Sequence, residues 1–344
     1  MVAFPEDVEN KLREGLPGAW YVVAKSVQVP TDGTFATRAL GKNIVLWRGE
    51  DGKVRCTNDY CPHRGAPLSR GTVRGNNLSC RYHGVTVDGS GSIVAVPAMP
   101  NCALVGRSGV QGYAVEELAD AVFVYFPSAE YPEPRPFTPP PELADPAYSK
   151  FLCTTVWEAN WRYAVENLVD PMHGCYLHAD TFTLAYGSKE DVLRLKPISG
   201  GFRVERAGQQ GVNFDWCEFQ MDDAVPRCRL AIPYPPSAGP GGALELLPLV
   251  TPIDAQSMRI FFWRMRKVSG LEAEVWRFLF RTKYEPRHWD VLEQDREMIS
   301  AMPDNARNTE LLYQHDIGVG RARQWMTQRA KSLIAAEDAA KAAA

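Results

Sequence analysis

Two short loops in the first quarter of the chain together carry four side chains that bind soft or borderline metals. Cys61-Pro-His63 is followed, after sixteen residues, by Cys80-Arg-Tyr-His83. Two thiolates and two imidazoles suit either a structural zinc ion or a [2Fe–2S] cluster in which two histidines replace two cysteines on one iron. A zinc ion would take all four ligands, whereas a cluster would place Cys61 and Cys80 on one iron and His63 and His83 on the other. Both interpretations require a fold that holds the two loops side by side.

The residues around these ligands favour the cluster. Gly65 and Gly84 follow the last ligand of each loop, which suits tight turns whose amides point at bridging sulfides. The runs C-P-H-R-G-A-P-L-S and C-x-Y-H-G resemble the Rieske domain of ring-hydroxylating and O-demethylating oxygenases. They are less similar to respiratory Rieske proteins, which carry an extra cysteine in each loop where this chain has only other residues.

Composition sets outer bounds on the function. The chain has 344 residues, a formal net charge of −3 and no basic run, which argues against nucleic-acid and membrane-surface partners. The longest apolar run, residues 121–126, is too short to span a bilayer, and residues 1–15 lack the apolar core of a secretory signal. Eight irregularly spaced cysteines do not indicate a disulfide framework. We therefore expect a cytoplasmic protein of two domains.

Local patterns predict an α+β chain. Short β-rich runs separated by Gly- and Asp-containing turns indicate an N-terminal domain of β-strands at residues 1–130. This domain begins with a short helix at 5–15. A stiff Pro-rich linker follows at 131–148. Residues 149–344 form the second domain, an antiparallel sheet flanked by helices, with the C-terminal helices closing it. Its expected strands are 192–196, 201–206, 215–221, 227–232, 243–251 and 257–266.

The second domain opens with another histidine motif, Asp170-Pro-Met-His173-Gly-Cys-Tyr-Leu-His178. Five helical steps of 100° place the two histidines about 140° apart, so they converge on one ion only if the helix is distorted. Pro171 and Gly174 make such a distortion plausible. Two ordinary histidines on a surface helix remain the alternative.

Asp295 is the carboxylate that best completes a ligand set with these histidines. The apolar residues at 291, 292, 298, 299 and 302 form one helical stripe, and Asp295 lies in its middle. A carboxylate that faces a core is costly unless it is paired or binds a metal. A mononuclear iron(II) triad of two histidines and one carboxylate satisfies that requirement, and a buried salt bridge is the alternative. The resemblance agrees, since the oxygenases have D-x2-H-x4-H followed far downstream by an aspartate ligand on a helix.

The resemblance also implies roles for two neighbours of the motif. Asp170 matches the acid that links the iron histidine of one subunit to a Rieske histidine of the next, and Asn167 lies near the iron. A carboxylate that accepts imidazole N–H bonds orients a ligand and shortens the path between the centres. The simpler interpretation of Asp170 is a helix cap before Pro171.

The resemblance covers nearly the whole chain and implies a terminal oxygenase of the branch that includes vanillate and dicamba O-demethylases. Such an enzyme is a homotrimer that uses a Rieske [2Fe–2S] cluster, mononuclear Fe(II) and O2 to hydroxylate or O-demethylate a small aromatic substrate, with an aromatic acid as the favoured type. A separate reductase or ferredoxin would relay electrons from NAD(P)H, because the chain has no GxGxxG fingerprint. A cis-dihydroxylating dioxygenase, a Rieske electron carrier and a zinc-stabilised binding protein are the alternatives.

The substrate pocket is the least constrained feature. Arg227, Arg229 or Arg259 could pair with a substrate carboxylate, although solvated strand positions are the simpler interpretation. His288 and His315 are expected to be ordinary surface or packing histidines. The candidate pocket residues follow the histidine motif or lie on strands: Phe182, Leu184, Tyr186, Phe219 and Trp263.

Overall fold

The structure is a computed structural model of the chain. It describes residues 5–181, 184, 187–221, 225–235, 237, 239–240, 242–303 and 305–343. Contacts divide the chain into a small unit, Pro17–Phe137, and a large unit formed by Met1–Leu16 and Thr138–Ala344. Each unit is described by itself.

The small unit is all-β, as the sequence predicts. Its strands form three antiparallel sheets, in the orders β1-β11-β10, β2-β3-β4-β9 and β5-β6-β7-β8. The strands and two short 3-10 turns are β1 (Ala19–Lys25), η1 (Ser26–Gln28), β2 (Thr34–Ala39), β3 (Lys42–Arg48), β4 (Val54–Asn58), η2 (Leu68–Arg70), β5 (Thr72–Arg74), β6 (Asn77–Ser79), β7 (Thr86–Val87), β8 (Ile93–Ala95), β9 (Gly112–Tyr113), β10 (Val115–Leu118) and β11 (Ala121–Phe126).

Two apolar cores hold these sheets together. β11 is buried at all its positions because its run of apolar residues packs on both faces. A second core, which includes Trp47, Leu68 and Leu78, also contains Cys61 and Cys80. The loops that carry the four candidate ligands are therefore anchored by their cysteines in a packed interior.

The large unit is built on a seven-stranded antiparallel sheet, which confirms the predicted α+β class. The strand order is β12-β18-β17-β16-β15-β14-β13, a meander with β12 added beside β18. Buried residues alternate with more exposed ones, most clearly in β16, because successive side chains point to opposite faces of the sheet. The strands are β12 (Tyr148–Trp157), β13 (Leu193–Ile198), β14 (Gly201–Arg206), β15 (Trp216–Gln220), β16 (Arg227–Ile232), β17 (Leu244–Pro252) and β18 (Met258–Lys267).

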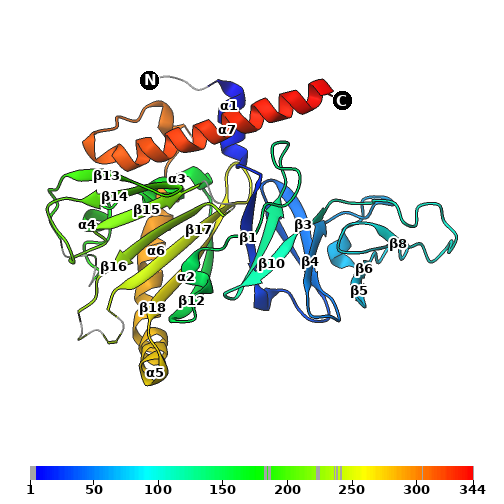
Figure 1. The fold of residues 1–344 in the computed structure, drawn as a ribbon, viewed down its shortest axis with the longest axis horizontal. Helices are drawn as coiled ribbons and strands as arrows, with labels where there is room; N and C mark the ends of the chain where they lie inside the picture. Colours follow the sequence, from blue (N-terminus) through cyan, green and yellow to red (C-terminus); the bar gives the residue numbers. More distant parts are fainter. Residues whose placement is uncertain are drawn as a thin grey trace. The chain divides into compact units, whose positions relative to one another are not determined.

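Helices cover this sheet, with α6 lying across one of its faces in Figure 1. A π-helical segment, η4, joins α5 to α6. The helical elements are α1 (Glu6–Glu14), α2 (Pro141–Ala144), α3 (Trp161–Leu168), α4 (Gly174–Leu177), α5 (Gly270–Leu279), η4 (Phe280–Tyr284), α6 (Glu285–Ser300), η5 (Ala306–Asn308), η6 (Gln314–Asp316) and α7 (Ile317–Ala343).

The N-terminal helix belongs to the large unit, whereas the sequence analysis placed it with the first domain. Figure 1 shows α1 beside α7, and Lys11 of α1 pairs with Glu337 of α7 at 2.7 Å. Glu9 accepts two hydrogen bonds from the guanidinium of Arg162 on α3, and Trp161 donates its indole N–H to the Leu12 carbonyl. These partners are more than a hundred residues away in the sequence, so local pattern alone does not reveal the attachment.

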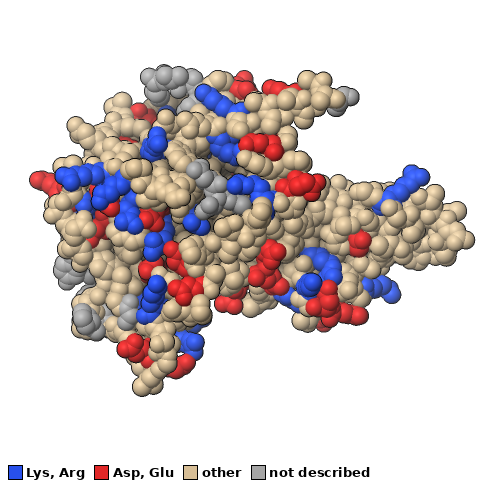
Figure 2. Space-filling view, viewed as in Figure 1, with Lys and Arg blue, Asp and Glu red and all other residues tan. Residues whose placement is uncertain are grey.

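Charges on the surface are mixed in sign. On the face shown in Figure 2, lysines and arginines are interspersed with aspartates and glutamates rather than gathered in one patch. In the part of the chain that the structure describes, no helix is both long enough and apolar enough to cross a membrane.

Candidate metal centres

The two cysteine–histidine loops of the small unit have the same backbone geometry. The Cys61 amide donates to the Ala66 carbonyl at 2.7 Å, and the Cys80 amide donates to the Val85 carbonyl at 2.8 Å. The amides of Gly65 and Gly84 close each turn onto the cysteine carbonyl, with φ values of +74° and +73°. Both turns therefore need the left-handed conformation that glycine adopts at little cost.

Thiols and imidazoles lie at different depths in these loops. Cys61 and Cys80 are buried, whereas His63 and His83 are exposed, with ring centroids 4.7 Å apart. Burial raises the pKa of the Cys61 thiol, while the backbone amides of His63 and Arg64 donate to its sulfur and oppose that rise. Buried sulfur ligands with amide donors beside exposed imidazoles fit a [2Fe–2S] group with two unlike ends.

The second candidate centre brings His173, His178 and Asp295 together in the large unit. Nε2 of His178 lies 3.3 Å from Asp295 Oδ1, and Nε2 of His173 lies 3.6 Å from the same oxygen. The three donor atoms lie within 4.8 Å of one another. His178 and Asp295 are buried, and His173 is partly exposed. Two imidazole nitrogens and one carboxylate on one side of an ion form the facial set that suits Fe(II).

His173 and His178 are the N-cap and C-cap of one short helical turn, so no regular helix runs through both of them. α3 ends at Leu168, and regular helix resumes only for the single turn of α4, from Gly174 to Leu177. The expected distortion at Pro171 is thus a full interruption. Gly174 is also required sterically, because a side chain there would collide with the ring of Phe214.

Neighbouring groups orient each imidazole. Nδ1 of His173 contacts the Asp170 carbonyl at 2.7 Å, and Nδ1 of His178 contacts Gln294 Oε1 at 2.7 Å. Because both partners are acceptors, both Nδ1 atoms carry the proton and both Nε2 lone pairs face Asp295. Asn167 donates to Asp295 Oδ1 at 3.2 Å, which places it beside the site formed by His173, His178 and Asp295.

The charge balance of this cluster favours a cation. Burial tends to lower the pKa of His178, but the hydrogen bond and negative charge of Asp295 outweigh burial and raise it. A buried carboxylate against two imidazoles is therefore stabilised by a positive charge between them, either a proton or a metal ion.

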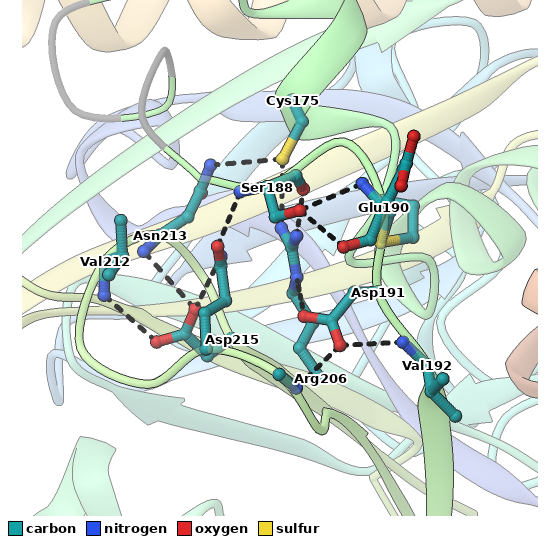
Figure 3. Close-up of polar contacts among 12 residues, drawn as sticks. Cys175, Ser188, Glu190, Asp191, Val192, Arg206, Val212, Asn213 and Asp215 are labelled. Carbon is teal, nitrogen blue, oxygen red and sulfur yellow. Dashed lines mark hydrogen bonds and ion pairs between the residues drawn. The ribbon is translucent and has the colours of Figure 1, made fainter.

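A buried network of polar contacts holds the segment that carries His173 and His178 (Figure 3). Cys175, which lies between the two histidines, accepts from Arg206 Nη1 at 2.9 Å. Arg206 also pairs with Asp191 at 3.2 Å, and both side chains are buried. Burial raises the pKa of Asp191, but the amides of Gly208 and Val192 and the guanidinium of Arg206 outweigh it and lower the pKa. The network ties the histidine segment to β14.

A narrow apolar cavity lies between α6 and the sheet. Its volume is about 50 Å³, less than the 150 Å³ or so of a cavity that accommodates benzene, so a ring would displace lining side chains. Its lining includes residues that follow the histidine motif, residues of three strands and one face of α6: Thr181, Leu184, Ile232, Tyr234, Leu246, Phe262, Arg264, Tyr284, Arg287, His288, Val291 and Leu292.

A wider hollow of about 860 Å³ opens on the other side of the candidate centre. Asn167, Asp170 and His173 line it, so this side of the histidine is accessible from the surface. Met298 and Met302 also line it and are exposed, although the sequence analysis placed them on the buried stripe of α6. The stripe is therefore shorter than its apolar spacing suggests.

Comparison with protein families assigns both units. Residues 19–115 match the model of the Rieske [2Fe-2S] domain, and residues 157–332, just over half of the chain, match the vanillate O-demethylase oxygenase C-terminal domain. The chain belongs to the vanillate O-demethylase oxygenase family.

Individual relatives are consistent with this family. The chain is 34% identical over 187 residues to the vanillate O-demethylase oxygenase subunit of Pseudomonas sp. (strain HR199 / DSM 7063), covering 50% of this chain and 46% of that protein. It is 31% identical over 177 residues to the terminal oxygenase component of carbazole 1,9a-dioxygenase from Metapseudomonas resinovorans, covering 51% and 45%. The matched stretches thus span about half the length of these curated relatives.

Solved structures share the fold of this family member. Dicamba monooxygenase bound to dicamba aligns over 92% of this chain and 98% of its own, with a TM-score of 0.72 and 21% identity. A fluorene-bound oxygenase–ferredoxin complex of carbazole 1,9a-dioxygenase aligns over 94% and 92%, with a TM-score of 0.75 and 22% identity. At these identities the likeness establishes the fold.

The predicted pocket residues of this oxygenase-family chain divide into three groups. Leu184 lines the narrow cavity, and Phe182 and Tyr186 lie outside the described residues. Phe219 is buried against Phe202 and is not among the residues that line the cavity. Trp263 is fully buried on β18, and strand alternation turns it to the face opposite its neighbours Phe262 and Arg264, which do line the cavity.

The arginines proposed as carboxylate partners are engaged elsewhere. Arg229 pairs with Glu142, Glu218 and Glu245, and Arg227 donates to Gln220. Arg259 is likewise not among the cavity-lining residues.

Two polar residues that line the cavity, His288 and Arg264, were not predicted as pocket residues from the sequence. His288 is half-buried and lies on the same face of α6 as Asp295, a helical spacing that could have revealed it. Arg264 interrupts an apolar strand, which is the second available signal. His315, by contrast, contacts the Asp191 carbonyl at 2.7 Å, a packing role as expected.

Proposed function

We propose that the chain is the terminal oxygenase of a multicomponent system that uses O2 and NAD(P)H-derived electrons to hydroxylate or O-demethylate a small aromatic substrate. The observation that carries this proposal is the presence of two metal-ligand sets of different chemistry in one chain. Cys61, Cys80, His63 and His83 would hold a one-electron carrier. His173, His178 and Asp295 would hold Fe(II) with coordination positions left open.

The neighbours of His173, His178 and Asp295 orient these three ligands. A bound [2Fe–2S] cluster would supply one-electron transfer, and a bound Fe(II) ion would supply O2 activation. Gln294 and the Asp170 carbonyl hold the two Nδ1 protons, so both imidazoles present Nε2 to the ion. Asn167 donates to Asp295 and fixes which carboxylate oxygen faces the histidines.

We propose that electrons enter through Asp170 from the cluster of a neighbouring chain in a homotrimer. Three observations support this: the Asp170 side chain is partly exposed beside His173, both open onto the wide hollow, and His63 and His83 are exposed at the surface of the small unit. An acceptor carboxylate on one chain can thus meet an exposed imidazole of another.

The electron donor would be a separate reductase or ferredoxin. Among the structural relatives are complexes of an oxygenase with a ferredoxin, which supports a separate carrier. We also propose a cytoplasmic location, because the six cysteines other than Cys61 and Cys80 are free thiols and such thiols persist in a reducing compartment.

Iron and acid-labile sulfide per chain test the proposal, measured on protein purified without oxygen or chelator. We expect about three irons to two sulfides, and Asp295→Asn should lower iron to about two while leaving sulfide unchanged. Glu293→Gln, which alters an exposed residue of the same helix, should keep the full ratio. Zinc without sulfide would refute the proposal. Mass spectrometry of the product under ¹⁸O2 then separates monooxygenation from dihydroxylation.

A further inference from the structure

Two arginines are buried beneath the helices of the large unit without a carboxylate partner. Arg264 and Arg266 lie two residues apart on β18 and therefore on the same face of the sheet, and their exposed fractions are 2% and 0%. Among the described residues, neither forms an ion pair. The pKa of each guanidinium is lowered by burial. A buried charge without a counter-charge is strongly unfavourable, so the site lacks an anion.

Aromatic rings satisfy only the faces of these guanidinium groups. Arg264 lies over Trp289 at 5.4 Å from the ring centroid, and Arg266 lies over Trp276 at 4.3 Å and Tyr234 at 4.8 Å. Most N–H groups at the edges of the two guanidinium groups are not hydrogen-bonded within the described residues. Within the described residues, Nη1 and Nη2 of Arg264 have no hydrogen-bond partner, nor do Nε and Nη2 of Arg266. Only Nη1 of Arg266 donates, to the Pro240 carbonyl at 2.7 Å.

The one carboxylate that raises the pKa of Arg264 among the described residues is already paired with another arginine. The negative charge of Glu285 raises the pKa of Arg264, but the Glu285 carboxylate pairs with Arg281 at 2.8 Å. Arg281 is exposed, so this pair is at the surface rather than in the cavity. The positive charge in the interior is thus not neutralised by a neighbouring side chain of the described residues.

His288 adds a neutral polar group to the same place. Its Nε2 contacts the Tyr234 hydroxyl at 3.2 Å, and its Nδ1 is buried and has no partner among the described residues. Burial and the nearby charges of Arg264 and Arg266 hold the pKa of His288 well below its usual value. When Nε2 accepts from the hydroxyl, Nδ1 carries a proton that it can donate.

The helix sets the distance from this polar group to the candidate iron. His288, Leu292 and Asp295 follow one another at spacings of four and three on α6, so they share a face. Seven residues of α-helix rise about 10 Å. Val291 and Leu292 line the cavity within this interval, and Arg264, which lies over the ring of Trp289, is on the His288 side of it. One substituted aromatic ring spans such an interval.

We propose that the cavity binds an aromatic substrate by an oxyanion, a carboxylate or sulfonate, which Arg264 pairs with and His288 hydrogen-bonds at the end distant from the iron. This inference rests on the proposed function, because it takes the His173–His178–Asp295 end as the reacting end. Arg266 adds positive potential behind Arg264. The anion would restore the missing counter-charge and hold the opposite edge of the ring toward the metal ligands.

Calorimetric titration of the anaerobic, unreduced, iron-loaded protein tests the inference with three probes: benzoate, benzenesulfonate and the neutral isostere benzamide. We expect at least one oxyanion to bind about tenfold or more tightly than benzamide, because hydrogen bonds to a charged group are stronger than those between neutral groups. The preferred oxyanion then identifies the carboxylate or the sulfonate as the recognised group.

Matched variants assign the preference to Arg264. Arg264→Gln should weaken oxyanion binding by about tenfold or more and leave benzamide affinity within about twofold, which also shows that the cavity is intact. Arg227→Gln, an arginine outside the cavity, should change neither. The comparison in the unaltered protein stands even if Arg264→Gln does not fold.

Three results would overturn the inference: no binding of either oxyanion, equal affinity for benzamide in the unaltered protein, or full oxyanion affinity in Arg264→Gln. The proposed function fails by a different measurement, since the iron-to-sulfide ratio of the same sample reports on the metal centres and not on the arginine.

Discussion

Gln294 Oε1 lies 2.7 Å from Nδ1 of His178, and the next residue of α6, Asp295, faces the other ring nitrogen at 3.3 Å. Two consecutive residues of one helix thus contact both nitrogens of one imidazole. This arrangement fixes the tautomer of His178 and the orientation of its ring before any metal binds.

The first prediction concerns this contact. Gln294→Leu removes the acceptor for the Nδ1 proton and should lower iron affinity by about 10–100-fold, while Gln294→Glu keeps an acceptor and should retain most of it. Chelator titration of iron from each protein, with sulfide as the internal reference, measures the effect. Equal iron affinity in the leucine and glutamate variants would contradict the orienting role.

The second prediction concerns Asp170. Asp170→Asn keeps an oxygen that can accept from the Met172 amide, a bond of 2.8 Å in the structure, so the fold and both metal centres should remain. Product formation coupled to NAD(P)H should fall by about 10–100-fold, because the proposed path between centres is broken. Glu297→Gln, the same acid-to-amide change at an exposed position of α6, is the control. Full coupled activity in Asp170→Asn would exclude the bridging role.

The third prediction concerns the buried network behind the histidines. Arg206→Met leaves the buried carboxylate of Asp191 without its ion pair and should destabilise the protein by about 3–5 kcal/mol. It also removes the donor to Cys175, so iron should dissociate faster in chelator. Urea unfolding measures the first effect. Arg194→Met, at an exposed position of β13, should be nearly neutral, and similar losses in both variants would refute the assigned role.

The fourth prediction concerns the attachment of α1. The guanidinium of Arg162 outweighs the effect of burial and lowers the pKa of Glu9 from 4.5. A lowered pKa in the folded state gives stability that is present above the unfolded value and is lost as pH falls through the folded value. Glu9→Gln should therefore lower the melting temperature at pH 7 and have less effect as pH drops below about 4.5.

The control for this effect is Glu6→Gln, at an exposed position of the same helix, whose melting temperature should follow the unaltered protein at both pH values. A constant difference between Glu9→Gln and the unaltered protein across this range would show that the ion pair does not contribute as argued.

The amino-acid sequence by itself determined the features that depend on neighbours along the chain. The Cys61 and Cys80 turns follow from ligands and glycines a few residues apart. Six strands of the large sheet follow from local pattern to within two residues, whereas β12 was not among the expected strands. The interruption of the helix ahead of His173 follows from Pro171. Asp295 could be singled out because helical spacing is also local.

Only the tertiary structure decided which distant groups meet. The attachment of α1, the Asn167–Asp295 bond and the pairing of Arg229 with three glutamates join residues far apart in the sequence. The same is true of the cavity, where Arg264 of a strand and His288 of a helix belong to one lining that has no carboxylate among its described residues. Burial and the absence of a counter-charge are properties of packing, and periodicity along the chain does not encode them.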